Sequence, residues 1–331
     1  MSRFAADLPV DVVRLRHRAA GMRRYGFGYL LHRYARNRLA LVGLWVVLGI
    51  VAVALFASWV APASPIKPDF GNLLRSPSAA HPMGTDDLGR DVLSRVIFGA
   101  RTALLAGVLS VGIAVLAGLP LGLLSGYYGG RLDDLLMRLT DAMLSFPFLV
   151  LALALAAVLG AGLDKALLAI GIVFTPRFIR LARAQVLGER EQNYVEAARA
   201  MGVGDGRIIW RHILPNSVSP IVVQASLDMA GAITAEATLS FLGLGTQPPT
   251  PSWGLMLSST GRAFMEQAPW LAIFPGLAIS LAVLAFNLFG DTLRDAWDPK
   301  LRKGCRDRPV SRDAVPGSLR PHPGRRADAR R

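Results

Sequence analysis

Long apolar runs alternate with short polar segments along most of the chain. Five of the runs reach about the 20 residues that a helix needs to cross a bilayer. A sixth, at 166–176, is too short alone, but its helical pattern continues through three arginines that can reach back to the membrane interface. We therefore predict an all-α membrane protein with six transmembrane helices. The five long runs are residues 39–60, 102–124, 143–163, 217–244 and 269–290.

The polar segments divide the chain into four parts. Residues 1–38 are an arginine-rich cytoplasmic arm that can lie on anionic membrane lipid. Residues 39–101 hold the first helix and an extracytoplasmic segment, and residues 102–300 hold a five-helix core. Residues 301–331 are rich in Arg, Pro, Asp and Gly and lack apolar periodicity, so we expect a disordered cytoplasmic tail.

The distribution of arginine predicts the orientation. The loop 177–216 carries seven arginines, whereas the loop 245–268 carries only Arg262. Because cytoplasmic loops hold an excess of Lys and Arg, the first of these loops and a short loop at 126–141 should be cytoplasmic. With six spans, both termini then lie in the cytoplasm. The seven arginines are Arg177, Arg180, Arg183, Arg190, Arg199, Arg207 and Arg211.

The longest polar stretch between two strongly apolar ones is 196–215, which reads EAARAMGVGDGRIIWRHILP. Its start has the apolar spacing of a short helix. Gly202 and Gly204 should end that helix, because glycine readily adopts the left-handed conformation. Asp205 can cap a second short helix, and Pro215 should end it, because the residue before a proline avoids the helical region.

This helix, glycine turn and second helix would lie at the foot of a membrane span. We expect Ile208, Ile209 and Trp210 to be exposed on the second helix. Exposed apolar residues on a short helix suit docking into a groove of another protein. By its shape alone, the segment is equally compatible with an ordinary cytoplasmic loop between two spans.

The spacing within this loop resembles the EAA coupling loop of permeases from ATP-binding-cassette (ABC) importers. That loop has Glu-Ala-Ala, three residues, a glycine, and then nine residues before Ile-x-Leu-Pro. The present sequence departs from it at one position, where His212 replaces the family isoleucine and Ile213 follows. The positions that match are Glu196, Ala197, Ala198, Gly202, Leu214 and Pro215.

Two further strings resemble the dipeptide, oligopeptide and nickel importer group of these permeases. They are HPMGTDDLGRDVLSR at 81–95 and AEATLSFLGLG at 235–245. With the coupling loop at 190–216, the likeness extends over residues 30–302. It implies a type I ABC importer permease fold in the bacterial cytoplasmic (inner) membrane. It also implies ATP-driven import of peptides, of nickel or of a related small solute.

The resemblance implies partners as well. A second, similar permease would complete a heterodimer. Two ATPase subunits would bind ATP and Mg, while this chain would hold no cofactor and catalyse no reaction. An extracytoplasmic solute-binding protein would deliver the solute.

The same resemblance assigns roles within the coupling loop. Glu196 would make a charged contact with the ATPase. Ala197 and Ala198 would let the two surfaces approach closely, and Gly202 would set the turn. The apolar contacts in the ATPase groove would come from Ile208, Ile209 and Trp210.

Asp228 and Glu236 are the only acids inside a predicted span. A charge at mid-bilayer costs about 2.5–3.5 kcal/mol on insertion scales, so such residues usually face a cavity or a partner. We expect Asp228 to line the solute path, whereas Glu236 either lines it or pairs locally near the outer surface. As an alternative function, a secondary transporter would use both as a proton or sodium relay, but it leaves the coupling loop unexplained.

Other classes of function lack the residues that they need. No G-x-x-x-x-G-K-[ST] loop is present to hold a nucleotide phosphate, and no H-E-x-x-H or G-x-S-x-G motif is present. The net charge of +14 does not indicate nucleic acid binding, because the basic residues flank the apolar runs.

One polar cluster admits two interpretations. His81, Asp86, Asp87 and Asp91 resemble the ligands of a metal site. We favour the alternative, a surface helix that is capped by Thr85 or Asp86 and pairs its own charges. We therefore predict no metal site.

Overall fold

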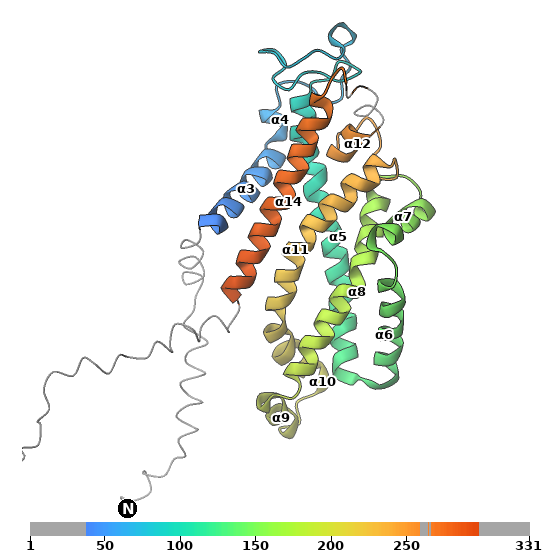
Figure 1. Cartoon of the computed structure of the whole chain (residues 1–331). Helices are drawn as coiled ribbons and strands as arrows, with labels where there is room; N and C mark the ends of the chain where they lie inside the picture. The colour runs from blue at the N-terminus through green and yellow to red at the C-terminus, as the bar shows by residue number, and fades with distance from the viewer. Residues whose placement is uncertain (1–37, 259–263, 265, 298–331) are drawn as a thin grey trace, which may run out of the picture. The chain divides into compact units, whose positions relative to one another are not determined.

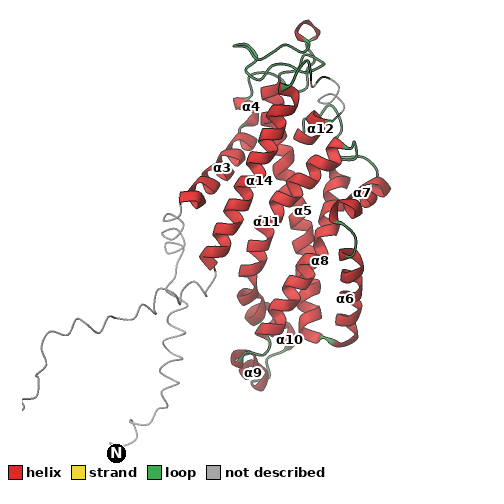
Figure 2. Ribbon diagram, viewed as in Figure 1, coloured by secondary structure: helices red, strands yellow, loops and turns green. Residues whose placement is uncertain are grey.

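The computed structural model describes residues 38–258, 264 and 266–297 of the 331-residue chain. Within these residues the regular structure is helical, apart from one isolated β-bridge between Thr85 and Asp91. Figures 1 and 2 show long helices side by side, with short helices and loops at their two ends. The predicted all-α membrane fold is confirmed. The predicted arm, apart from Arg38, and the predicted tail lie outside the described residues.

Five long helices build the bundle. They are α3 (Arg38–Leu55), α5 (Val92–Tyr128), α8 (Leu163–Glu189), α11 (Leu214–Phe241) and α14 (Trp270–Trp297). The central helix α5 contacts α3, α8 and α11 (Figure 1). α3 and α14 share a buried cluster that includes Val47, Ala282 and Phe286.

Glycines let α5 and α8 pack closely. A Cβ atom added at Gly118, Gly122 or Gly126 would lie 2.7, 2.5 or 2.8 Å from an atom of α8. Small residues at four-residue spacing are typical of helices that approach closely in membranes, because van der Waals contact replaces the missing hydrophobic drive. This contact joins the two helices along their C-terminal halves.

The first predicted span, 39–60, is interrupted at Phe56. α3 ends at Leu55, and a short helix, α4 (Ala57–Val60), follows. Arg101 of α5 donates from Nε to the carbonyl oxygen of Ala54 at 2.5 Å and from Nη2 to that of Leu55 at 3.1 Å. A helix end leaves such carbonyl groups without partners, so the arginine stabilises the break.

The second predicted span is longer than its apolar run. α5 begins at Val92 rather than at 102 and has 37 residues, which is about 55 Å at 1.5 Å per residue. Its cap is Asp91, whose Oδ2 accepts from the Ser94 N–H at 2.8 Å. The predicted cap at Thr85 or Asp86 is therefore wrong. The helix exceeds the hydrocarbon thickness of about 30 Å and extends beyond it.

The third predicted span, 143–163, is not one continuous helix, and the loop predicted before it is mostly helical. Residues 126–141 lie mostly in a helix, α6 (Gly130–Leu144), which is followed by α7 (Phe148–Leu159) after a bend of 95°. Pro147 precedes α7 and accounts for the break, because proline lacks an N–H and disfavours a helical residue before it.

The number of spans stays a prediction. By length and composition, three helices of the described residues suffice to cross a membrane, or four if α6 and α7 count as one broken span. Neither α8 nor α3 is among these helices. The second half of the 27-residue α8 carries arginines, and the apolar part of α3 is short.

The α5–α8 contact can be tested with two matched substitutions in α5. Gly122→Ala should destabilise the protein by about 1–3 kcal/mol, because its methyl group would meet the carbonyl oxygen of Ile179. Gly112→Ala should stabilise it by up to about 1 kcal/mol, because no atom lies within 4 Å of that Cβ and alanine favours helix. Thermal unfolding of the purified protein in detergent measures both. Equal melting temperatures for the two variants would contradict the close packing.

Candidate functional site

The predicted coupling loop forms two short helices at one end of the bundle (Figure 1). They are α9 (Asn193–Ala200) and α10 (Asp205–Ile208). Gly202 lies between them with φ of +76°, in the left-handed region. A Cβ there would meet no atom within 4 Å, so the backbone conformation, not the space, calls for glycine. The predicted order of helix, glycine turn and helix is confirmed.

The second helix does not end at Pro215. A π-helical segment, η2 (Ile209–Ile213), follows α10 and leads directly into α11, so one helix runs from Asp205 to Phe241. Pro215 is the second residue of α11 and follows the π-helical segment directly, so the helix continues through the proline. The coupling loop is therefore joined to a membrane helix without an intervening turn.

Ile208 of α10 and Ile209 of η2 are buried, contrary to the prediction that they are exposed. Ile208 and Ile209 pack with residues of α5, α8 and α9 in a cluster that we call the coupling-loop core. An exposed position on a solvated loop would leave the apolar surface of both side chains in water, which is unfavourable. The coupling-loop core consists of Leu123, Tyr127, Val186, Val195, Ala198, Ile208, Ile209 and Ile213.

The outer face of the loop holds the other predicted coupling residues. Glu196, Ala197 and Gly202 are exposed, and Trp210 is 59% exposed. Ala198 is buried in the coupling-loop core, so the predicted close approach to a partner rests on Ala197 alone. The residues near the end of the motif differ: His212 and Leu214 are partly buried, and Pro215 is exposed.

Polar contacts with Tyr127 add to this packing. The Tyr127 hydroxyl donates to Asp205 Oδ1 at 2.6 Å, and the Arg199 guanidinium lies 5.2 Å from the centre of its ring. Asp205 does not cap α10 as predicted; its carboxylate is bound by α5 instead. Tyr127 was missed because an aromatic residue at the end of an apolar run carries no signal of a distant partner.

Tyr194 links the two helices that flank the loop. Its hydroxyl donates to Glu189 at the end of α8 at 2.5 Å and accepts from Asn216 of α11 at 3.2 Å. Burial and then the neighbouring Glu189 carboxylate raise the pKa of Tyr194 to about 12. The hydroxyl therefore keeps its proton, and this link persists, at neutral pH.

The arginines of α8 are paired with acids on neighbouring helices. Arg183 binds both carboxylate oxygens of Asp133 on α6 at 2.6 Å, and Arg180 pairs with Asp141 on the same helix. These pairs hold α6 against α8 and explain why a polar segment is helical. The signal was present in the sequence, since both rows of charges have helical spacing.

Asp228 lies near the middle of α11 and is buried. Its Oδ1 accepts from Arg177 Nη1 at 2.5 Å and from Gln224 Nε2 at 3.1 Å. Both helices carry this ion pair near their midpoints. The sequence predicted an interior role for Asp228 but not its arginine partner.

Glu236 lies in a buried cluster of hydroxyl groups. Its Oε1 accepts from Ser240 at 2.6 Å and from Thr246 and Ser252 at 2.9 Å. Ser252 immediately precedes α12 (Trp253–Leu257), so the carboxylate ties this short helix to α11. Of the two predicted roles, the local contacts of Glu236 support local pairing.

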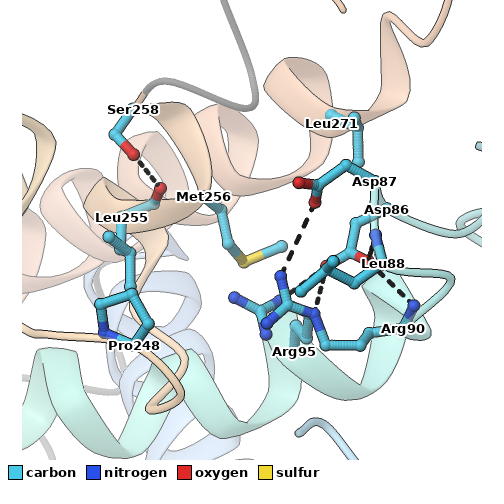
Figure 3. Close-up of a pocket in the computed structure, with 10 residues that line it drawn as sticks. All are labelled: Asp86, Asp87, Leu88, Arg90, Arg95, Pro248, Leu255, Met256, Ser258 and Leu271. Atoms are coloured by element: carbon cyan, nitrogen blue, oxygen red, sulfur yellow. Dashed lines mark hydrogen bonds and ion pairs between the residues drawn. The ribbon is translucent and has the colours of Figure 1, made fainter. Parts of the chain in front are cut away.

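Charged and apolar side chains line a cavity of about 200 Å³ beside α12 and the start of α5 (Figure 3). Figure 1 shows α12 at the end of the bundle opposite α9. Asp86 accepts from Arg90 Nε at 2.7 Å, and Arg95 Nε lies 3.5 Å from the same carboxylate oxygen. His81 contacts the capping residue Asp91. These contacts agree with self-paired charges. Within the described residues, no group of three His, Cys, Asp or Glu side chains is arranged to hold a metal ion.

Two family models match the sequence. The family described as "Binding-protein-dependent transport system inner membrane component" matches residues 118–303, more than half of the chain. The family described as "N-terminal TM domain of oligopeptide transport permease C" matches residues 27–77.

Named relatives cover most of the chain. The dipeptide transport system permease protein DppC of Alkalihalophilus pseudofirmus is 48% identical over 81% of this chain and 88% of its own length. The di/tripeptide transport system permease protein DppC of Pseudomonas aeruginosa is 50% identical over 82% and 91%. The glutathione transport system permease protein GsiD of Escherichia coli O6:K15:H31 is 47% identical over 82% and 89%.

A solved structure has the same fold. The MetNI methionine ABC transporter, in an inward-facing conformation, matches with a TM-score of 0.52 and 18% identity over 62% of this chain and 98% of that chain. The likeness supports the predicted type I importer permease fold.

These matches do not support the secondary-transporter alternative, and the family they identify is one of transport subunits rather than enzymes. The chain therefore belongs to the family of binding-protein-dependent transport system inner membrane components, and it is a permease subunit of an ABC importer.

Proposed function

We propose that this chain is one of two permease subunits in an importer of short peptides, with a second, similar permease completing a heterodimer. The relatives named above transport dipeptides, tripeptides and glutathione by their names, and glutathione is itself a tripeptide. Nickel is in none of those names, so peptides are the better supported solute. Both termini and the coupling loop would lie in the cytoplasm.

The exposed face of the coupling loop is the proposed docking surface for an ATPase subunit, which would supply ATP and Mg. Glu196 offers a charge and Ala197 a flat surface beside it, whereas Trp210 offers a large apolar side chain. Tryptophan is enriched among the residues that contribute most to binding energy at interfaces. Ile208, Ile209 and Ala198 would support this surface from below rather than contact the partner.

The observation that carries the proposal is the continuous helix from Asp205 to Phe241. A displacement of α10 by a docked ATPase would pass into α11 without an intervening loop. The hydrogen bond from Tyr127 would pass it to α5 as well. Since α11 carries Asp228 near its middle, such a movement would change the surroundings of the membrane-embedded ion pair.

The opposite end of α11 would face the extracytoplasmic binding protein. Glu236 ties α12 to that end, and the cavity of Figure 3 lies between α12 and the start of α5. A binding protein that contacts α12 would therefore act on the same helix that the ATPase moves.

The glycine turn gives a test of docking. Gly202→Val should lower solute uptake at least tenfold and reduce ATPase co-purification, because valine is strongly disfavoured at a φ of +76°. The matched control is Gly206→Val, which lies in α10 without a positive φ and has open space around its Cβ. Uptake in proteoliposomes and the subunit ratio of the purified complex measure both. Wild-type levels of uptake and of ATPase co-purification in the Gly202 variant would exclude the proposed role of the turn.

Two further substitutions separate docking from folding. Trp210→Ala should weaken ATPase binding by about 2 kcal/mol, roughly thirtyfold, and leave the melting temperature unchanged because the side chain is exposed. Ile208→Ala should do the reverse and cost about 2–5 kcal/mol of stability, because that side chain is buried. Titration with the ATPase and thermal unfolding in detergent measure the two effects. A Trp210 variant with a lowered melting temperature and normal ATPase binding would overturn the assignment of Trp210 to the docking surface.

A further inference from the structure

A charged group stands half-exposed at the middle of two long helices. Arg177 lies near the midpoint of α8 and Asp228 near that of α11, and the two form an ion pair at 2.5 Å. The arginine side chain is 47% exposed, while the aspartate side chain is only 5% exposed. The carboxylate is thus covered, and the guanidinium forms the surface above it.

The guanidinium has unused hydrogen-bonding capacity. Within the described residues, its one hydrogen bond is the donation from Nη1 to Asp228 Oδ1. A guanidinium carries five N–H donors, and Arg183, one turn and a half further on, uses two nitrogens on both oxygens of Asp133. The Arg177 Cζ lies over the Phe174 ring, 5.4 Å from its centre.

The aspartate side is also incompletely satisfied. Asp228 Oδ2 is buried and has no hydrogen-bond partner among the described residues. Buried polar atoms in proteins are nearly always paired, so Oδ2 is a free acceptor beside the guanidinium. Gln224 fixes Oδ1 from the same helix and leaves the arginine as the group that faces outward.

The membrane environment limits what this arginine can face. Arg177 is paired with Asp228, which lies in a helix long and apolar enough to cross a membrane. A charged side chain within the bilayer is costly against lipid, and such residues face a bundle interior, a water-filled path or a partner. A neutral Arg–Asp pair whose positive member is the exposed one presents a planar donor surface. Its geometry matches a carboxylate, which guanidinium groups bind through two parallel hydrogen bonds.

We propose that Arg177 binds the carboxylate group of a solute as it crosses the membrane, and that Asp228 and Gln224 are positioning residues that hold the guanidinium. This rests on the proposed import of peptides, each of which ends in a carboxylate. The negative charge of Asp228 weakens the attraction between Arg177 and the solute carboxylate. Weak binding suits a path that a solute must enter and also leave. Because α11 continues into the coupling helix, movement of the loop would shift Asp228 and so change the strength of this contact.

The test compares dialanine, which has a free carboxylate, with dialanine amide, which lacks it. The complete importer is reconstituted in proteoliposomes with its partner subunits and with binding protein preloaded with either compound. Arg177→Gln should lower uptake of dialanine about tenfold or more, the size expected for lost hydrogen bonds to a charged group, and should change uptake of the amide far less. Arg177→Lys, which keeps the charge but not the fork, should lie between the two.

The matched control is Arg180→Gln. Arg180 lies on the same helix, is similarly exposed and pairs with Asp141 of α6, so its loss should leave the ratio of dialanine to amide uptake unchanged. Since Arg177→Gln alone leaves Asp228 uncompensated, the double variant Arg177→Gln, Asp228→Asn keeps the site neutral. It should assemble with its partners and show the same loss of carboxylate preference.

A second measurement avoids the binding protein. Millimolar dialanine should raise the melting temperature of the purified wild-type importer, and it should not do so for the double variant. Equal loss of dialanine and amide uptake in the Arg177 variants would overturn the proposal. Release of the second permease when these variants are purified would also overturn it, because Arg177 would then be a contact between subunits. If the wild-type importer carries neither compound, the peptide assignment itself fails, whatever the variants do.

Discussion

Burial of the coupling-loop core is the interaction on which the rest of the structure depends. Ile208, Ile209 and Ile213 place their side chains against the ends of α5 and α8, and each contributes about 1.5–3 kcal/mol relative to an exposed position. Without this packing, α9 and α10 would be a polar loop tethered at two points. With it, the loop is a rigid extension of three membrane helices. The hydrogen bond from Tyr127 to Asp205 fixes its orientation on that base.

Much of the fold could be predicted because hydrophobic length and helical period are local properties. The runs at 217–244 and 269–290 became α11 and α14, and the run that continues through Arg177 became the single helix α8. The glycine turn was also predictable, because Gly202 alone accounts for a left-handed backbone. The family likeness then supplied the role that the pattern could not.

The errors arose where a distant partner decides the local structure. Residues 126–141 looked like a loop because of their charges, but Asp133 and Asp141 are held by arginines of α8 and favour the helix α6. Ile208 and Ile209 looked exposed because they stand in a polar stretch, although α5 and α8 cover them. Pro215 was taken as a stop signal, yet the helix continues through it and also through Pro220. Arg177, Thr246 and Ser252, which contact Asp228 or Glu236, lie outside α11 and leave no trace in the spacing of that helix.

The hydroxyl cluster around Glu236 has a thermodynamic consequence. It holds α12 against the C-terminal end of α11, and the N-terminal end of the same continuous helix is α10 of the coupling loop. The ATPase and the binding protein would therefore act on opposite ends of one helix. Linkage then requires symmetry: the factor by which nucleotide strengthens or weakens capture of the loaded binding protein equals the factor by which that capture alters nucleotide affinity. An effect of the ATPase on the binding-protein site therefore implies an equal effect of the binding protein on the ATPase site.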